Sequence, residues 1–227
     1  MKKKSNYEDL LSYVDLNPNI IVEVGIKDGQ DTLIISKKFK NSKYFAYEAN
    51  PLMKKVIKKK LMFRRNVVFE NFGLGEVNEM KSFFIFTPDQ KIDFNVIGAS
   101  SFYNRPDIEN ITELKNCKID TLANEMLKKK INNIDILLMD VQGYELNVLK
   151  GAGEKIADIS YVIMETPKPE LIKNQNSIKY NLEINDYIGA PTYDEVFNFM
   201  REHSFTLVKS LDENLWETNS LFKNDRI

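Results

Sequence analysis

The sequence of 227 residues contains one cysteine, one histidine and no excess of either charge. Cys117, the single cysteine, cannot form an intramolecular disulfide. One cysteine and one histidine, His203, are also too few for a usual zinc site. The 32 basic and 33 acidic residues give a net charge of −1, which provides no global attraction toward nucleic acid or an anionic membrane. We therefore expect no metal ion, no nucleic-acid partner and no membrane partner, although an oxygen-only magnesium site around Asp140 stays open.

The sequence also lacks long apolar runs. No stretch approaches the ~20 apolar residues of a membrane-spanning helix. Polar residues 5–9 follow the basic start where the apolar part of a signal peptide would begin. The lysine-rich segment 54–60 has apolar residues at helical spacing, which fits a solvated helix face better than a nucleic-acid patch. We therefore expect a cytoplasmic protein.

Short apolar runs alternate with amphipathic segments along most of the chain, and apolar types make up 43% of it. The predicted strands are 20–25, 43–48, 80–86, 134–140 and 159–165, and residues 66–73 are predicted to form a further strand and turn. The predicted helices are 31–39, 52–63, one that begins at a cap on Asp120 and runs to about residue 130, 144–150 and 193–203. We expect one domain over residues 1–227, with its core at about 20–222.

This alternation predicts a mostly parallel sheet with helices on both faces. Residues 205–208 and 215–222 are expected to add an antiparallel C-terminal hairpin. Residues 87–118 have no sustained period, and residues 166–191 form a polar insertion. Both segments are predicted to be loops on the substrate side.

The first strand leads into a turn that contains Gly25 and Gly29. Glycines let the backbone approach a ligand closely at the carboxyl end of a parallel strand. The dinucleotide fingerprint G-x-G-x-x-G would also need glycine where Lys27 and Gln30 stand. The turn therefore favours a nucleotide-like cofactor other than NAD.

Glu48 follows the second predicted strand. It lies about 20 residues after Gly25, where a carboxylate can accept hydrogen bonds from both ribose hydroxyls. A carboxylate there would repel a 2′-phosphate, which disfavours NADP. An adenosine cofactor with a free ribose fits this pattern.

Four blocks of sequence point to a known family: EVGIKDG at 23–29, YEANP at 47–51, GASS at 98–101 and MDVQGYELNVLKGA at 139–152. Together they resemble the FkbM-type methyltransferases. The resemblance implies a Rossmann-like class I methyltransferase fold, whose mostly parallel sheet has seven strands. It also implies S-adenosylmethionine as methyl donor and, usually, a hydroxyl oxygen as acceptor.

Residue roles follow from this resemblance by position. The residues implied to bind the cofactor are Glu23, Gly25, Lys27, Asp28, Gly29, Glu48, Asn71, Phe72, Gly73 and Asp140. Two positions in the four blocks depart from the commonest pattern of the family. Glu23 stands where Asp is frequent, and Gln142 stands where Glu is frequent, so the site loses one potential carboxylate.

Candidates for the chemistry are the acids near the carboxyl ends of strands. Asp140, Glu145 and Glu165 are candidates for the general base or for a group that positions the acceptor. Glu145 is equally explained as a first-turn acid that the helix dipole favours. The candidate substrate-binding residues are Ser100, Ser101, Gln142 and Lys168. The serines have the alternative of local turn hydrogen bonds.

The expected function is therefore O-methylation of a hydroxyl on a small-molecule or carbohydrate acceptor. Methylation of nitrogen or of a protein side chain is the first alternative. A non-catalytic cofactor-binding or interaction domain of the same fold is the second, and Gln142 is the residue that favours it. The oligomeric state stays open.

Overall fold

A computed structural model describes residues 7–86, 97–105, 111–180 and 187–227. Within these residues the main sheet has seven strands in the order β3-β2-β1-β7-β8-β10-β9. Its parallel strands are β1 (Ile20–Val24), β2 (Lys43–Tyr47), β3 (Val67–Glu70), β7 (Ile134–Met139) and β8 (Ile159–Pro167). The antiparallel strands are β9 (Phe205–Asp212) and β10 (Glu217–Asn224). The predicted mostly parallel sheet with a C-terminal antiparallel pair is confirmed.

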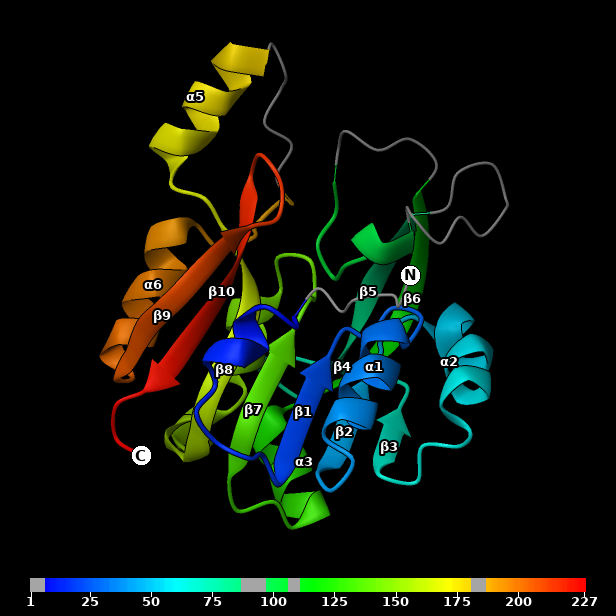
Figure 1. Cartoon of the computed structure of the whole chain (residues 1–227). Coiled ribbons are helices and arrows are strands. Elements are labelled where there is room, and N and C mark those ends of the chain that lie inside the picture. The colour runs from blue at the N-terminus through cyan, green and yellow to red at the C-terminus, as the bar shows by residue number, and fades with distance from the viewer. Residues whose placement is uncertain (1–6, 87–96, 106–110, 181–186) are drawn as a thin grey trace, which may run out of the picture.

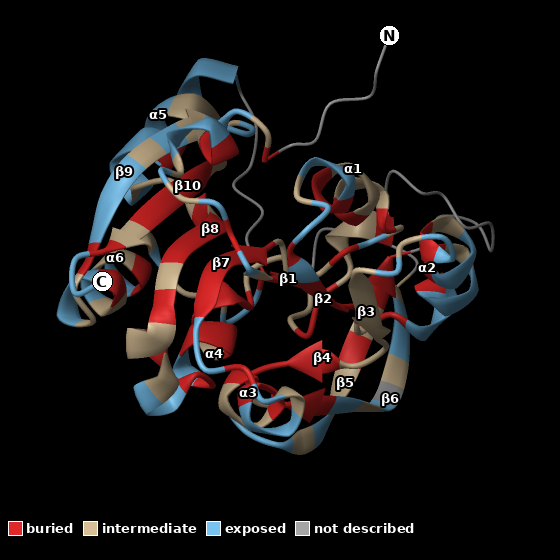
Figure 2. Cartoon of the chain, turned by 60° about the horizontal axis from the view of Figure 1, so that its bottom comes forward, coloured by how far each residue is buried: buried red, intermediate tan, exposed pale blue. Residues whose placement is uncertain are grey.

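Helices cover both faces of this sheet (Figure 1). On one face, α1 (Gln30–Lys38) and α2 (Lys54–Leu61) pack with alternate strand residues such as Ile21 and Ile136. On the other, α3 (Leu122–Lys129), α4 (Glu145–Lys150) and α6 (Tyr193–Glu202) pack with Val22 and Leu137. Because successive strand residues point to opposite faces, both faces bury apolar side chains. The inner strands are mostly buried, whereas the edge strands β3 and β9 are intermediate and mostly exposed, respectively (Figure 2).

A smaller sheet of three strands lies beside the main one, in the order β4-β6-β5. It contains β4 (Gly73–Leu74), β5 (Glu79–Phe86) and β6 (Ile111–Asp120). The predicted loop over 87–118 is therefore wrong from residue 111 onward. The alternation in β6 is interrupted because its register with β5 shifts between Lys81 and Phe83, and Asn116 has a left-handed φ of 61°. The remainder of that loop prediction lies partly outside the described residues.

Two further expectations need correction. The polar insertion 166–191 contains a helix, α5 (Glu170–Tyr180), so it is not a loop throughout. The N-cap of α3 is Thr121 rather than Asp120, because the Thr121 Oγ1 accepts a hydrogen bond from Asn124 N at 3.1 Å. Short 3-10 segments η1 (Leu10–Tyr13), η2 (Pro51–Met53), η4 (Ile97–Ala99) and η5 (Gly153–Asp158) complete the described fold. Within the described part, no helix has the length and apolar character needed to cross a bilayer.

Candidate functional site

A pocket of about 590 Å³ opens where β1, β2 and β7 end. Such carboxyl-end crevices are where open α/β sheets bind ligands. Among the predicted site residues, those that line it are Gly25, Lys27, Glu48, Phe72, Gly73, Ser100 and Asp140. Two further lining residues, Asn50 and Met53, were given no role by the sequence.

The floor of the pocket is the turn after β1. Gly25 has a φ of +79°, and a Cβ atom there would lie 1.9 Å from the carbonyl oxygen of Asp140. Only glycine therefore allows β1 and the end of β7 to approach this closely. Gly29, with a φ of +74°, precedes the first residue of α1. The two glycines of the sequence motif thus shape the turn between β1 and α1.

Glu48 lies at the end of β2 and is tied to the turn. Its Oε2 accepts a hydrogen bond from Lys27 N at 2.7 Å, and its Oε1 accepts one from Asn50 N at 2.8 Å. Burial raises the pKa of Glu48 to about 7 despite these hydrogen bonds. The predicted residue Asn71 does not line the pocket; its Nδ2 donates to Glu48 O at 2.7 Å and supports the strand end.

Asn50 lines the same pocket and is almost fully buried. Its Oδ1 accepts a hydrogen bond from Leu52 N at 3.0 Å at the start of η2. Its Nδ2 has no hydrogen-bond partner within the described residues. An unpaired buried donor costs about 1–3 kcal/mol, so this amide is explained if a ligand supplies the acceptor. The sequence signals for Asn50 are its place two residues after Glu48 and its position within the block at 47–51.

Asp140 and Glu165 lie at the ends of the adjacent strands β7 and β8 and share one amide donor. Gln142 Nε2 donates to Asp140 Oδ1 at 2.6 Å and to Glu165 Oε2 at 3.0 Å. Burial raises the pKa of Asp140 to about 6. Burial and the neighbouring Asp140 raise the pKa of Glu165 well above its usual range. The neutral Gln142 thus lies between two acids, Asp140 and Glu165. A carboxylate at position 142 would repel both of them.

Gln142 is itself held from two sides. Its backbone oxygen accepts a hydrogen bond from Ser101 Oγ at 2.8 Å, and its Oε1 lies 2.8 Å from the Tyr187 hydroxyl. The same hydroxyl lies 2.6 Å from the backbone oxygen of Ala99. Ser101 therefore orients the turn after β7, whereas Ser100 lines the pocket and donates to Ile97 O at 2.8 Å.

A second pocket, of about 510 Å³, lies next to Glu165. Its lining includes the acids Glu145, Glu165, Glu170 and Glu217, together with Lys173 and Tyr187. Glu145 begins α4, and its Oε1 accepts a hydrogen bond from Val141 N at 3.0 Å. Burial raises the pKa of Glu145 to about 8. The Asp140–Gln142–Glu165 chain of hydrogen bonds joins the two pockets.

Three other predicted residues lie outside both pockets. Glu23 Oε2 accepts hydrogen bonds from the hydroxyls of Thr32 at 2.5 Å and Tyr44 at 2.7 Å beneath the turn. Burial raises its pKa to about 8. Asp28 Oδ2 pairs with Lys60 of α2 at 2.5 Å.

Lys168 is the third of them. It donates to Asn214 O at 2.7 Å and pairs with Asp212 at 2.9 Å, on the β9–β10 hairpin. The structure therefore places Glu23, Asp28 and Lys168 where they support the fold around the pockets.

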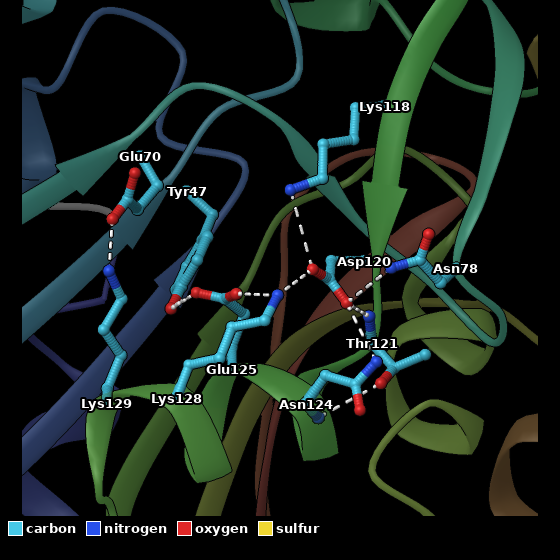
Figure 3. Close-up of polar contacts among 10 residues, drawn as sticks. All are labelled: Tyr47, Glu70, Asn78, Lys118, Asp120, Thr121, Asn124, Glu125, Lys128 and Lys129. Carbon is cyan, nitrogen blue, oxygen red and sulfur yellow. Dashed lines mark hydrogen bonds and ion pairs between the residues drawn. The ribbon is translucent and has the colours of Figure 1, made fainter.

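A different cluster of acids surrounds the end of β6 (Figure 3). Asp120 is fully buried and pairs with Lys128 and with Lys118, the latter at 3.6 Å. Burial alone would raise its pKa, but Lys128, Asn124 and Thr121 outweigh burial and lower the pKa to about 2. Nearby, Lys128 also pairs with Glu125 at 3.0 Å. Each of these acids has a cationic partner. Within the described residues no group of three or more Asp, Glu, His or Cys side chains is arranged to hold a metal ion.

Solved structures with the same fold are distant in sequence. A putative tRNA (m1A22) methyltransferase from Streptococcus pneumoniae, in complex with S-adenosyl-L-methionine, aligns with a TM-score of 0.53 at 9% identity, over 99% of this chain and 75% of that one. Aeropyrum pernix fibrillarin with natively bound S-adenosyl-L-methionine aligns with a TM-score of 0.52 at 9% identity, over 90% of this chain and 66% of that one. The fold is that of Rossmann-like methyltransferases.

The family follows from the sequence itself. Residues 23–207, well over half of the chain, match the FkbM methyltransferase domain. The chain therefore belongs to the FkbM methyltransferase family, as the four sequence blocks predicted. No curated protein matches it.

The first pocket meets the chemical needs of an adenosine cofactor. Glu48 offers carboxylate oxygens to a ribose diol, and the unpaired Nδ2 of Asn50 offers a donor beside it. The absence of a Cβ atom at Gly25 leaves the turn close to Asp140. Donor, acceptor and close backbone approach are the features that a nucleoside-containing ligand requires.

Proposed function

We propose that this enzyme transfers the methyl group of S-adenosylmethionine to a hydroxyl of a small-molecule or carbohydrate acceptor. The observation that carries the proposal is the position of Asp140. It lines the first pocket, and Gln142 joins it by hydrogen bonds to Glu165, which lines the second. Asp140 thus lines the pocket proposed for the cofactor and is linked through Gln142 to an acid of the pocket proposed for the acceptor.

In this proposal the first pocket holds the cofactor. Glu48 would accept from the ribose hydroxyls, and Asn50 Nδ2 would donate to an acceptor atom of the nucleoside. Gly25, Lys27 and Asp140 would lie along the methionine part, while Gly73 and Phe72 would flank adenine. When bound, the cofactor supplies a methyl group activated by a positively charged sulfur.

The second pocket would hold the acceptor, with its hydroxyl directed at Asp140. As the new oxygen–carbon bond forms and the carbon–sulfur bond breaks, the hydroxyl proton needs a base. The pKa of Asp140, raised to about 6, suits this task near neutral pH because the group is ionised yet basic. Glu145 and Glu165 also line this pocket and would position acceptor hydroxyls.

The cofactor assignment is tested by calorimetric titration with S-adenosylhomocysteine. We expect saturable binding by the wild type and a loss on the order of 100-fold in Glu48→Ala, because two charge-assisted hydrogen bonds disappear. Glu70→Ala is the matched control: Glu70 ends the neighbouring strand, pairs with Lys129 and lies outside the pocket. Absence of binding by folded wild type would overturn the proposal.

The acceptor assignment is tested by measuring turnover with different classes of acceptor. Purified enzyme is incubated with S-adenosylmethionine and panels of neutral glycans, phenols and amines, and release of S-adenosylhomocysteine is measured. We expect turnover with hydroxylated acceptors and none with matched compounds whose hydroxyl is replaced by hydrogen. Turnover confined to amines or to protein side chains would replace the hydroxyl assignment, while leaving the cofactor assignment intact.

A further inference from the structure

The segment 51–65 is strongly basic, although the whole chain is nearly neutral. It contains five lysines and two arginines, and no acid occurs between Glu48 and Glu70. The near-neutral net charge conceals this asymmetry because the compensating acids lie elsewhere in the sequence. The segment forms η2, α2 and the turn that follows, at the outer edge of the molecule (Figure 1).

The basic side chains share one face of α2. Ile57 and Leu61 are buried in the core, and the outer side of α2 is exposed (Figure 2). Lys54, Lys55, Lys58 and Lys59 are all exposed. Among the residues that the structure describes, no carboxylate pairs with these four lysines. Lys60, at the flank, pairs with Asp28 instead. The outward face therefore carries uncompensated positive charge.

Large apolar side chains flank these lysines at both ends. Leu52 is 46% exposed before the helix, and Met62 and Phe63 are 64% and 78% exposed after it. Leu52, Lys55, Lys59 and Met62 follow each other at spacings of three and four residues, which places them along one side of the helix. We call the exposed side chains of Leu52, Lys54, Lys55, Lys58, Lys59, Met62 and Phe63 the α2 surface.

We infer that the α2 surface docks on the anionic surface of a lipid bilayer. Clustered lysines are attracted to anionic headgroups, and exposed Leu, Met and Phe side chains gain by entering the headgroup region. Nucleic acid would use the lysines but would leave Leu52 and Met62 without a favourable environment. Two residues that line the first pocket lie next to this surface in the chain: Asn50 is two residues before Leu52, and Met53 is between Leu52 and Lys54. Docking would therefore hold that pocket near the membrane.

The test is co-sedimentation of the full chain with phosphatidylcholine vesicles, with or without phosphatidylglycerol. We expect binding to the anionic vesicles only, and a steep loss of binding at high salt because screening weakens surface charge interactions. The double variant Met62→Ser, Phe63→Ser should bind about tenfold more weakly or worse. Lys59→Glu should weaken binding by about fivefold or more.

Two variants outside the α2 surface serve as controls. Leu127→Ser removes an apolar side chain that is 67% exposed on α3, and Lys150→Glu reverses an exposed lysine at the end of α4. Both should bind vesicles as the wild type does. Thermal unfolding and S-adenosylhomocysteine titration of every variant would show that the fold and the cofactor pocket are unaffected.

Three outcomes would overturn the inference. One is equal binding to neutral and anionic vesicles or to neither. A second is equal weakening by the α2-surface and control variants. The third is binding of a single-stranded RNA oligomer that Lys59→Glu abolishes, without any vesicle binding, which would assign the α2 surface to nucleic acid instead.

Discussion

Two clusters of acids in this molecule have opposite surroundings. Asp140, Glu145 and Glu165 lie at the pockets, where burial and mutual repulsion raise their pKa values. Asp120, at the end of β6, is buried as deeply, yet lysines and amide donors lower its pKa to about 2. For Asp120, hydrogen bonds and the ion pairs with Lys128 and Lys118 outweigh burial. Within the described residues no ion pair is formed by Asp140, Glu145 or Glu165, and burial is the main cause of their raised pKa values.

The comparison separates acids that stabilise the fold from acids that are available for chemistry. A lowered pKa means that the native state favours the ionised form, and that form then contributes stability at neutral pH. A raised pKa means that the native state disfavours ionisation, so the group is a stronger base when ionised. We expect substitutions in the two clusters to separate stability from activity.

The largest effect is expected for Asp140→Asn. Loss of the proposed base should lower kcat by about 10²–10⁴-fold. The free energy of unfolding at pH 7 should stay unchanged or rise, because a buried carboxylate with a raised pKa is removed while the asparagine Oδ1 still accepts from Gln142. Turnover of the best acceptor and urea unfolding check both parts. Retention of wild-type kcat would remove Asp140 from the mechanism.

The converse is expected for Asp120→Asn. Because the pKa of Asp120 falls from 3.8 to about 2, its ionised form stabilises the fold by about 2 kcal/mol at neutral pH. That stability is present above pH ~4 and is lost as the pH falls toward ~2. Urea unfolding at pH 7 should therefore show the loss, while affinity for S-adenosylhomocysteine stays at the wild-type value. A loss of affinity without a loss of stability would contradict the division between the clusters.

A smaller effect is expected for Gln142→Glu, which adds the carboxylate that is frequent in the family. It removes the amide that donates to both Asp140 and Glu165, and it places a third acid between them. We expect a loss of about 1–2 kcal/mol at pH 8 and a smaller loss at pH 5, where the acids hold protons. Gln175→Glu, at an exposed position of α5, is the control and should be neutral at both pH values. Equal stability of Gln142→Glu and wild type at pH 8 would mean that the bridging amide is dispensable.

Much of the main sheet is predictable from sequence because its parallel strands are buried on both faces. Runs such as the one from Ile134 to Met139 are apolar except for Asp135, and the residue after each run therefore marks the carboxyl edge of the sheet. Glu48 and Asp140 were found in this way, and the structure places both in one pocket. Local sequence was sufficient to find these two residues, because a residue that follows a parallel strand lies at the carboxyl edge of the sheet.

Other parts depend on contacts between distant residues. The strand β6 follows no clean alternation because a register shift and the left-handed Asn116 interrupt it. The lack of a hydrogen-bond partner for Asn50 Nδ2 within the described residues becomes apparent only when the surrounding atoms are placed. The role of Gln142 likewise depends on Tyr187, 45 residues away, and on Glu165, 23 residues away. Sequence could name Gln142 as unusual but could not identify it as a bridge.

The last effect concerns the pH dependence of stability and tests Glu145. Burial raises the pKa of Glu145 to about 8, so between pH ~5 and ~8 it is protonated in the folded chain and ionised in the unfolded chain. Its stabilising contribution is therefore complete below pH ~4.5 and is lost as the pH rises through about 8. The unfolding free energy of the wild type should fall as the pH rises, and Glu145→Gln should make this slope shallower by about 1 kcal/mol per pH unit near pH 6–7.

Urea unfolding of the ligand-free chain at several pH values measures this slope, and Asp120→Asn supplies the contrast. A raised pKa acts above pH ~5 and a lowered one below pH ~4, so the two substitutions should change opposite ends of the same stability curve. If Glu145→Gln leaves the slope at pH 6–7 unchanged, Glu145 is ionised in the folded chain. It would then act as the first-turn acid of α4, held by Val141 N and favoured by the helix dipole, rather than as a group of the pocket.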